Sequence, residues 1–451
     1  MAVTPLKDWP NELLSSLLNL LPLTDLLSMT KVSKSIYALS LPLVYSTIET
    51  TWALGRTPSI VLLLRSLVER PELSGYIRNL RLEGNGVQGR PELRELPAFP
   101  LDAPLLSKAS KIIQSTKVPF ADLWIHELQS GTVDAIVALL LATLSNLTSL
   151  FLGPNFTVRS RLCGGMLRCA LCKPQKNLPA YKNLRHVTSK FRAKEYFHTD
   201  ICNAADILPL FYLPSIEDLS VSIDNPAEFT WPASYAPAPS IVSLDIYRLR
   251  ESRLGPVLSV LKALQKLHWH WSYQPDLDEE VSKGVVRLDT AAAALNEVAD
   301  TLTDLTISAM TRPRYSVGDY DPPPLEIRAS LDGLSRLRKL TKLSLPWAFL
   351  MGFSKSPTKR LLSALPPSLE VLRLTADLDD HDEWEWEEED SVIDAIKLEL
   401  ASLNSSRHPS LRRIILPIPF EYNEMTEDQK EELQTIGARV GLELGWFNRL
   451  K

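Results

Sequence analysis

The stretch "LTDLTI" (302–307) places three apolar residues at positions one, four and six. Residues separated by one position lie on the same face of a β-strand, so Leu305 and Ile307 point to one side. Leu302, three residues before Leu305, turns inward from the preceding loop. Such a unit has one apolar edge that it cannot cover alone, and only neighbouring copies of the same unit can bury it.

Similar stretches recur beyond residue 75. Close copies are "IRNLRL" (77–82), "LTSLFL" (147–152), "IEDLSV" (216–221), "IVSLDI" (241–246), "LQKLHW" (264–269), "LTKLSL" (340–345), "LEVLRL" (369–374) and "LRRIIL" (411–416), with degenerate copies at 121–128, 184–189 and 440–446. Measured at the fourth residue of each hexamer, the steps from Leu219 to Ile414 are 25, 23, 38, 38, 29 and 42 residues. This spacing resembles the leucine-rich repeat, with several units enlarged by insertions.

The segments between these copies have the apolar spacing of amphipathic helices. They are residues 255–267, 290–302, 358–366 and 390–404. Strands and helices that alternate along a stacked array give a parallel sheet on one side and helices on the other. We therefore expect an α/β fold, an irregular solenoid with a parallel concave sheet and outer helices.

In this register, the side chains flanking and between the paired apolar residues point out of the sheet. They belong to Asn79, Arg81, Glu83, Phe151, Asp218, Ser220, Asp245, Tyr247, Lys266, His268, His270, Asp304, Thr306, Lys342, Ser344, Arg373 and Arg413. A face that mixes charges and aromatic rings suits a macromolecular partner better than a small molecule. The candidate target-binding residues are Arg81, Phe151, Asp218, Tyr247, His268, His270 and Arg373.

The N-terminal stretch "WPNELLSSLLNLLPLTDLLSMTKVSKSIYAL" (9–39) is short and dense in leucine. It resembles the F-box motif, in which a proline, a glutamate and a leucine pair open an aliphatic helix, followed by Pro-x-x-Asp-Leu-Leu and a short third helix. The continuation "LPLVYSTIET" (41–50) looks like the tail often found after fungal F-boxes. Trp9 stands where the motif usually has leucine, and Ile36 where it usually has tryptophan. Both changes keep apolar bulk.

Leucines occupy more than one face of the first predicted helix, so a three-helix unit cannot bury them all. The resemblance supplies a partner, because F-boxes dock on the Skp-type adaptor of a cullin-RING ubiquitin ligase. The candidate partner-binding residues are Trp9, Pro10, Leu13, Leu14, Leu17, Val32 and Ile36, some of which must fill the core of the motif itself. The alternative is a plain helical cap that shields the first repeat of a solenoid.

The composition of the 451-residue chain is ordinary for a soluble globular protein, with 45% hydrophobic and 23% charged residues. We expect three parts: an F-box at 1–50, a linker helix at 51–75 and an irregular leucine-rich-repeat domain at 76–451.

The segment 377–390 holds ten acidic residues, and without them the net charge of the chain changes from −5 to +5 (49 basic against 44 acidic). Neither value indicates nucleic acid. We expect this run to be a solvated loop, or else a docking strip for a basic partner.

Two motifs have spacings that are typical of a cofactor site or a metal site. Gly84, Gly86 and Gly89 have the G-x-G-x-x-G spacing, but the prolines that follow exclude the long helix of a dinucleotide site. Cys169, Cys172, His198 and Cys202 could pair as zinc ligands, yet no second C-x-x-C frames them, so we expect buried loop cysteines. We predict no cofactor, no metal and no catalytic residue.

The longest uncharged apolar run, "AIVALLLATL" (135–144), is about half of what a bilayer needs. We expect no membrane association and a cytoplasmic or nuclear location. The resemblances together predict a non-enzymatic substrate adaptor of a Skp–cullin–F-box ubiquitin ligase, whose repeats hold an unknown target protein. The alternative is a leucine-rich-repeat scaffold that does not act in ubiquitination.

Overall fold

The structure is a computed structural model, and it describes residues 9–52, 58–84, 97–157, 160–173, 176–190, 203–277, 280–356, 359–386, 391–402, 409–417 and 426–447. The chain divides into two compact units. Unit 1 comprises Met1–Arg192 and Ala205–Ile216, and unit 2 comprises Ala193–Ala204 and Glu217–Lys451. Within the described ranges, no helix is long and apolar enough to cross a membrane.

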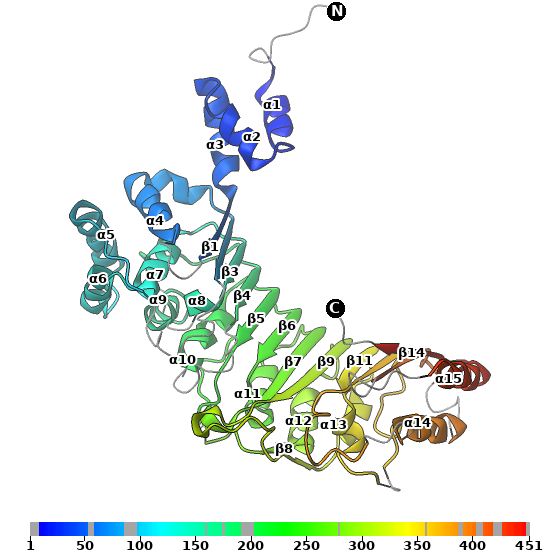
Figure 1. Cartoon of the computed structure of the whole chain (residues 1–451). Coiled ribbons are helices and arrows are strands. Elements are labelled where there is room, and N and C mark those ends of the chain that lie inside the picture. Colours follow the sequence, from blue (N-terminus) through cyan, green and yellow to red (C-terminus); the bar gives the residue numbers. More distant parts are fainter. Residues whose placement is uncertain are drawn as a thin grey trace, which may run out of the picture. The chain divides into compact units, whose positions relative to one another are not determined.

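Unit 1 opens with three short helices, α1 (Asn11–Leu18), α2 (Leu23–Met29) and α3 (Lys34–Ser46), seen in Figure 1. The Ser33 hydroxyl caps α3 by accepting a hydrogen bond from the Ile36 amide at 3.2 Å. The three helices share a small core made of Leu18, Leu26 and Ile36, against which Leu21, Met29, Leu39, Leu43 and Val44 pack. The three-helix segment is therefore present where the sequence predicts it.

Four strands of unit 1 are parallel and pair in chain order. They are β1 (Thr47–Trp52), β2 (Asn79–Gly84), β3 (Ser149–Leu152) and β4 (His186–Ser189). The sequence did not predict β1. Because β1 begins at Thr47, the sheet starts inside the segment expected to be only helical (1–50), and the expected linker (51–75) holds the end of β1 together with α4 (Ile60–Glu69) and a 3₁₀ helix, η2 (Pro71–Gly75).

The other helices of unit 1 lie between these strands or follow the last. They are α5 (Ala103–Thr116), α6 (Ala121–Ser130), α7 (Val133–Thr143), α8 (Pro154–Thr157), α9 (Arg161–Leu171) and η3 (Leu208–Tyr212), while α10 (Ala204–Ile207) begins where the two units divide. The degenerate copy at 121–128 was predicted as a strand and is helix α6. Its buried residues, Trp124 and Leu128, have the i,i+4 spacing of a helix, and the Trp124 indole donates to the Ala135 carbonyl at 3.0 Å.

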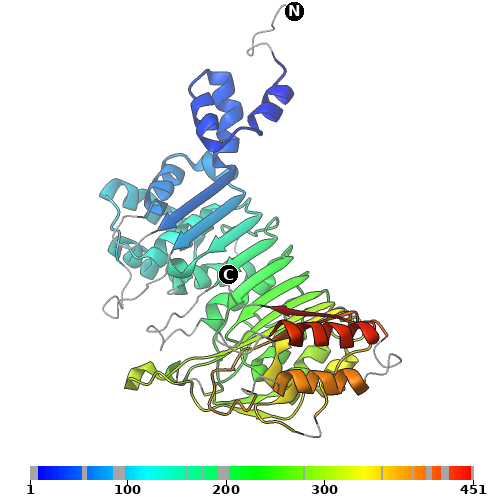
Figure 2. The same cartoon turned by 45° about the vertical axis from the view of Figure 1, so that its right-hand side comes forward.

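The described residues of unit 2 contribute eight parallel strands to the large sheet, and their side-by-side arrangement can be followed in Figure 2. They are β5 (Asp218–Ser222), β6 (Ser243–Tyr247), β7 (Lys266–Tyr273), β9 (Asp304–Thr311), β11 (Lys342–Pro346), β12 (Val371–Thr375), β13 (Arg413–Pro417) and β14 (Glu443–Phe447). Together with the four strands of unit 1, they make up the twelve described strands of the large sheet. The large parallel sheet of an α/β fold is thus confirmed.

The strand register of unit 2 follows the leucine pattern. The fourth residues of successive copies pair directly across the sheet, and they are Leu219, Leu244, Leu267, Leu305, Leu343, Leu372 and Ile414. Each of these side chains is at most 2% exposed, whereas the next residue along each strand is not buried. The alternation expected of a strand with one buried face is confirmed.

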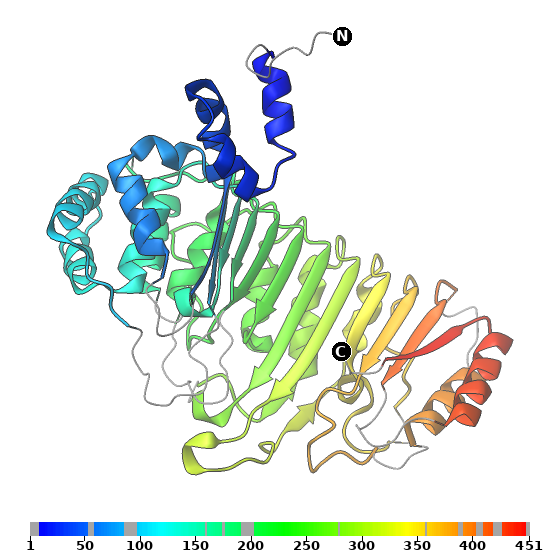
Figure 3. The same ribbon diagram turned by 45° about the horizontal axis from the view of Figure 1, so that its top comes forward.

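The inserted residues between widely spaced copies form additional strands. Each 38-residue step contains one strand of a separate two-stranded parallel sheet, β8 (Val285–Arg287) and β10 (Glu326–Arg328). The helical elements of unit 2 are α11 (Glu251–Leu258), α12 (Leu288–Leu295), α13 (Trp347–Met351), α14 (Ser391–Ser402) and α15 (Glu427–Arg439), with 3₁₀ turns η4 (Pro275–Leu277), η5 (Asn296–Val298), η6 (Tyr315–Val317) and η7 (Asp332–Arg336). Helices α11 and α12 lie behind the strands in Figure 3.

Two of the four predicted helices need correction. The segment 255–267 is helical only to Leu258, because β7 begins at Lys266 and uses its last residues. The described residues of 358–366 form turns without a helix. The copies at 290–302 and 390–404 do contain helices, α12 and α14.

The acidic segment is not simply a solvated loop where the structure describes it, at 377–386. His381, Trp384 and Trp386 are buried, and Trp386 donates to the Gly352 carbonyl at 3.0 Å. The carboxylate of Asp377 accepts from the Ala309 amide at the end of β9, at 2.9 Å. The two tryptophans therefore anchor the segment to unit 2 and do not form an exposed docking strip.

Candidate functional site

Two adjacent leucine stripes run along α1. Leu14 and Leu18 are four residues apart and buried, so they form the inner stripe. Leu13 and Leu17 are also four residues apart, but Leu13 is 55% exposed and Leu17 is half-buried. The first helix thus carries more apolar surface than its own core covers.

Helix α2 repeats this arrangement. Leu26 is buried, whereas Leu23 and Leu27, four residues apart, are 54% and 45% exposed. We call the exposed large apolar side chains of the three helices and of the residues beside them the N-terminal apolar surface, and they are Trp9, Leu13, Leu20, Leu23, Leu27, Val32 and Tyr37. The other large exposed hydrophobic side chains of the described residues are Leu62, Leu123, Tyr235, Met310, Val317, Tyr320 and Leu398, so half of all such side chains belong to residues 9–37.

The predicted partner-binding residues fall into two groups. Trp9, Pro10, Leu13 and Val32 are exposed, and Leu17 is half-buried. Leu14 is 3% exposed and Ile36 is 4% exposed, so these two cannot contact a partner directly and instead support the surface from within. Their burial is the expected property of core residues in a motif this small.

Sequence reasoning missed four members of the N-terminal apolar surface. They are Leu20, Leu23, Leu27 and Tyr37. The i,i+4 spacing of Leu23 and Leu27 was a readable signal, but it could not say which of the three leucines in α2 faces inward. That choice depends on where α3 packs.

In unit 1, the outward face of the sheet brings two predicted residues together. Arg81 on β2 and Phe151 on β3 are register partners. The guanidinium carbon of Arg81 lies 4.0 Å from the centroid of the Phe151 ring, and Glu83 forms an ion pair with Arg81 from two residues further along β2. Both side chains of this cation–π pair are half-buried, so part of the Arg81 guanidinium remains at the surface.

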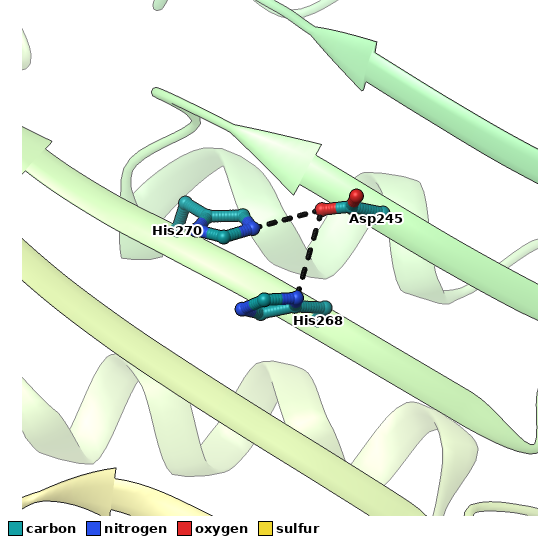
Figure 4. A group of neighbouring side chains, drawn as sticks. All are labelled: Asp245, His268 and His270. Carbon is teal, nitrogen blue, oxygen red and sulfur yellow. Dashed lines mark hydrogen bonds and ion pairs between the residues drawn. The ribbon is translucent and has the colours of Figure 1, made fainter. Parts of the chain in front are cut away.

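In unit 2, the outward face carries a second and more polar cluster. Asp245 on β6 lies directly opposite His268 on β7, and Tyr247 lies opposite His270. Figure 4 shows both imidazoles turned toward the Asp245 carboxylate. The distance from Asp245 Oδ1 is 2.9 Å to His270 Nε2 and 3.9 Å to His268 Nδ1. We call these three residues the Asp–His cluster.

Neighbouring side chains orient the Asp–His cluster. The Tyr247 ring stacks on His270 with 3.7 Å between centroids and 9° between planes. His270 Nδ1 is 2.7 Å from the Ser308 hydroxyl on β9, and the Ser220 hydroxyl on β5 donates to Asp245 Oδ2 at 3.0 Å. Four adjacent strands thus contribute to one polar patch.

Two other predicted target-binding residues lie on strands β5 and β12. Asp218 is exposed at the start of β5, and Arg373 is half-exposed on β12, opposite Ser344. Between His268 and His270, Trp269 points inward as predicted and donates to the Leu249 carbonyl at 2.7 Å. The register prediction therefore places every candidate of unit 2 on the outward face, where Tyr247, His268 and His270 lie together.

The predicted cysteine group is described in part. Cys163 and Cys169 lie on helix α9 and Cys172 follows its last residue, so the prediction of loop cysteines is wrong for these three. Cys163 and Cys172 are buried and Cys169 is half-buried, all as free thiols, while His198 and Cys202 lie outside the described residues. Burial raises the pKa of the Cys172 thiol to about 11. Such a thiol stays protonated near neutral pH, as expected of a structural cysteine. Gly84 ends β2, and Gly86 and Gly89 also lie outside the described residues.

No family model matches the chain, and no curated protein matches its sequence.

Proposed function

We propose that this chain is the substrate-recognition adaptor of a Skp–cullin–F-box ubiquitin ligase. In this proposal, the three N-terminal helices dock a Skp-type adaptor, and outward sheet residues hold a target protein. The chain has no bond-making role. It brings the target close to a ubiquitin-charged enzyme, so that reaction with the target's lysines occurs at high effective concentration.

The observation that carries the proposal is the N-terminal apolar surface. On α1, Leu13 is exposed and Leu17, four residues later, is half-buried, beside the buried stripe of Leu14 and Leu18. On α2, Leu23 and Leu27 are exposed at i,i+4 spacing, beside the buried Leu26. Covering one leucine side chain is worth about 1.5–3 kcal/mol, so a surface with several of them favours association with another chain. The F-box-like order of residues 9–39 indicates which kind of chain that is.

The outward sheet residues support the second half of the proposal. In unit 1, they include the Arg81–Phe151 pair, and in unit 2, the Asp–His cluster with Tyr247. Aromatic rings with fixed orientation and charged groups at their edges are the residues that protein interfaces favour. We propose that the repeating strand and helix units are leucine-rich repeats and that these residues form target-binding surfaces, one on each unit.

The test is co-purification of the adaptor and cullin with the full chain from cells. The variant Leu13→Asp/Leu27→Asp places two carboxylates on the N-terminal apolar surface. The matched control is Leu62→Asp/Leu123→Asp, which changes two exposed leucines on α4 and α6 of the same unit.

We expect the wild type and the control to retain both partners and the first variant to lose both. Adaptor recovery without cullin would favour a scaffold that does not act in ubiquitination. Recovery that does not depend on Leu13 and Leu27 would refute docking through this surface.

A further inference from the structure

The Asp–His cluster combines the three side chains that most often hold zinc in an open site. Two imidazoles and one carboxylate are a common ligand set for Zn²⁺ and related divalent transition ions. Among the described residues of the chain, this is the group of histidine, cysteine and acidic side chains whose ligand atoms come close enough for one ion. All three ligand atoms lie within 4.8 Å of one another.

The strand register produces this convergence without any special loop. His268 and His270 are two residues apart on β7, so both point to the outward face. Asp245 sits on the adjacent parallel strand, opposite His268. Backbone hydrogen bonds between β6 and β7 thus hold the three side chains at one place, which a surface loop would not do so firmly.

The distances fit a tetrahedral ion. Bonds of about 2.0–2.2 Å to nitrogen and oxygen put neighbouring tetrahedral ligands roughly 3.4 Å apart. The two measured separations, 2.9 Å from Asp245 Oδ1 to His270 Nε2 and 3.9 Å to His268 Nδ1, lie on either side of that value. Rotations of the Asp245, His268 and His270 side chains, without any backbone movement, would make the two distances equal.

Each of two ligands has a second hydrogen bond that turns its binding atom toward the cluster. Ser220 holds Asp245 Oδ2, which leaves Oδ1 toward the imidazoles. Ser308 lies at His270 Nδ1, which leaves Nε2 for the ion. When Nε2 binds a metal, Nδ1–H donates to the Ser308 oxygen, and such outer contacts fix the tautomer and orientation of metal-bound histidines. The stacked Tyr247 ring limits rotation of His270.

Exposure leaves room for an ion to enter and for a fourth ligand. The side chains of Asp245, His270 and His268 are 25%, 20% and 41% exposed. Three protein ligands with one position open to water are the arrangement of zinc sites that bind or activate an external group, in contrast to closed structural sites with four protein ligands.

We propose that Asp245, His268 and His270 form a binding site for a divalent zinc-class metal ion on the outward face of unit 2. Asp245 Oδ1, His270 Nε2 and a ring nitrogen of His268 are the protein ligands, and water completes the tetrahedron. The site is independent of whether the N-terminal helices dock an adaptor.

Cobalt(II) is the probe, because its visible absorption reports coordination number and ligand type. The purified full chain is stripped with a chelator, dialysed and titrated with Co²⁺, followed by competition with Zn²⁺. We expect one equivalent of four-coordinate Co²⁺, displaced by Zn²⁺, without the near-ultraviolet band of a cobalt–thiolate bond. That band separates this site from any site formed by cysteines.

The ligand variants are His268→Ala and Asp245→Asn, and the matched control is His126→Ala, which removes an exposed histidine on α6. We expect each ligand variant to weaken Co²⁺ binding at least tenfold and the control to leave it unchanged. Ser308→Ala, which removes only an outer contact, should weaken binding about tenfold while keeping the same spectrum. Circular dichroism confirms that each variant is folded.

Two results would overturn the proposal. Absence of saturable Co²⁺ and Zn²⁺ binding by the folded wild type would mean that the three residues form only an ion-pair cluster. Binding that is unchanged in both His268→Ala and Asp245→Asn, or that carries a thiolate band and is lost in Cys169→Ser/Cys172→Ser, would place the metal elsewhere.

Discussion

Leu13 and Leu14 are consecutive in α1, yet Leu13 is 55% exposed and Leu14 is 3% exposed. Leu13 therefore belongs to the surface of the three helices, whereas Leu14 belongs to their core. Consecutive helix residues point about a quarter of a turn apart, so a leucine pair widens the apolar face beyond what the inner core can cover.

Alanine substitution at each position distinguishes the core leucine from the surface leucine. Leu14→Ala removes buried apolar volume and should destabilise α1–α3 by about 2–5 kcal/mol. Leu13→Ala removes a side chain already in water and should change stability by less than about 0.5 kcal/mol. Hydrogen exchange of the amides in α1–α3 measures the stability change in both variants. Equal protection in the two variants would contradict this packing.

A second pair tests the repeat register. Leu305 and Thr306 are consecutive on β9, with Leu305 buried in the row of paired leucines and Thr306 on the outward face. Leu305→Ala should cost about 2–5 kcal/mol of unfolding free energy, and Thr306→Ala much less. Denaturant unfolding of the full chain gives both values. A larger loss for Thr306→Ala would mean that the strand faces are assigned the wrong way round.

The buried ion pair of unit 2 makes a third prediction. Arg250 and Glu251 are 1% and 5% exposed, and Glu251 also accepts from the Trp271 indole at 3.0 Å. Glu251→Ala should cost about 3–5 kcal/mol, because it leaves the Arg250 charge buried without its counter-ion. The control is Glu326→Ala, whose pair with Arg328 is exposed. Denaturant unfolding should show little change for the control, and an equally small change in Glu251→Ala would refute a structural role for the buried pair.

The pH dependence of unit 1 should reflect Asp134. Its carboxylate accepts from the Leu162 and Cys163 amides at 2.7 and 3.0 Å, but burial outweighs these bonds and raises its pKa from 3.8 to about 7. The folded state then binds a proton that the unfolded state releases near pH 4, so stability falls as pH rises from about 4 to 7, by up to about 4 kcal/mol.

Asp134→Asn removes this titration. We expect denaturant midpoints of the wild type to fall between pH 4.5 and 7.5 relative to those of Asp134→Asn, measured under identical ionic strength. Parallel profiles for the two proteins would contradict a raised pKa at this position.

Much of the sheet could be predicted because its signal is local. The leucine spacing identified β2 to β7, β9 and β11 to β14, together with which side chains face outward. Strand β1, "TIETTW", was missed because it lacks the leucine triplet and acquires its identity by pairing with β2. The copy at 121–128 was misassigned because its apolar residues fit both periodicities, and packing of Trp124 decided for the helix.

The candidate sites were predictable to different degrees. Register alone placed His268, His270 and Tyr247 on one face, but it gave no sign that Asp245 joins the two imidazoles, since that depends on side-chain rotation across strands. Residues 377–386 form turns and irregular structure with exposed carboxylates, as a solvated loop should, but the charge-dominated composition gave no sign that His381, Trp384 and Trp386 are buried.

The proposed function depends on docking of the N-terminal helices, which equilibrium binding of the purified chain to a purified Skp-type adaptor measures most directly. We predict a saturable one-to-one complex that weakens at least a hundredfold in Leu13→Asp/Leu27→Asp and is unchanged in Leu62→Asp/Leu123→Asp. Failure of the folded wild-type chain to bind the adaptor at all would contradict the account and leave α1–α3 as a cap on the sheet.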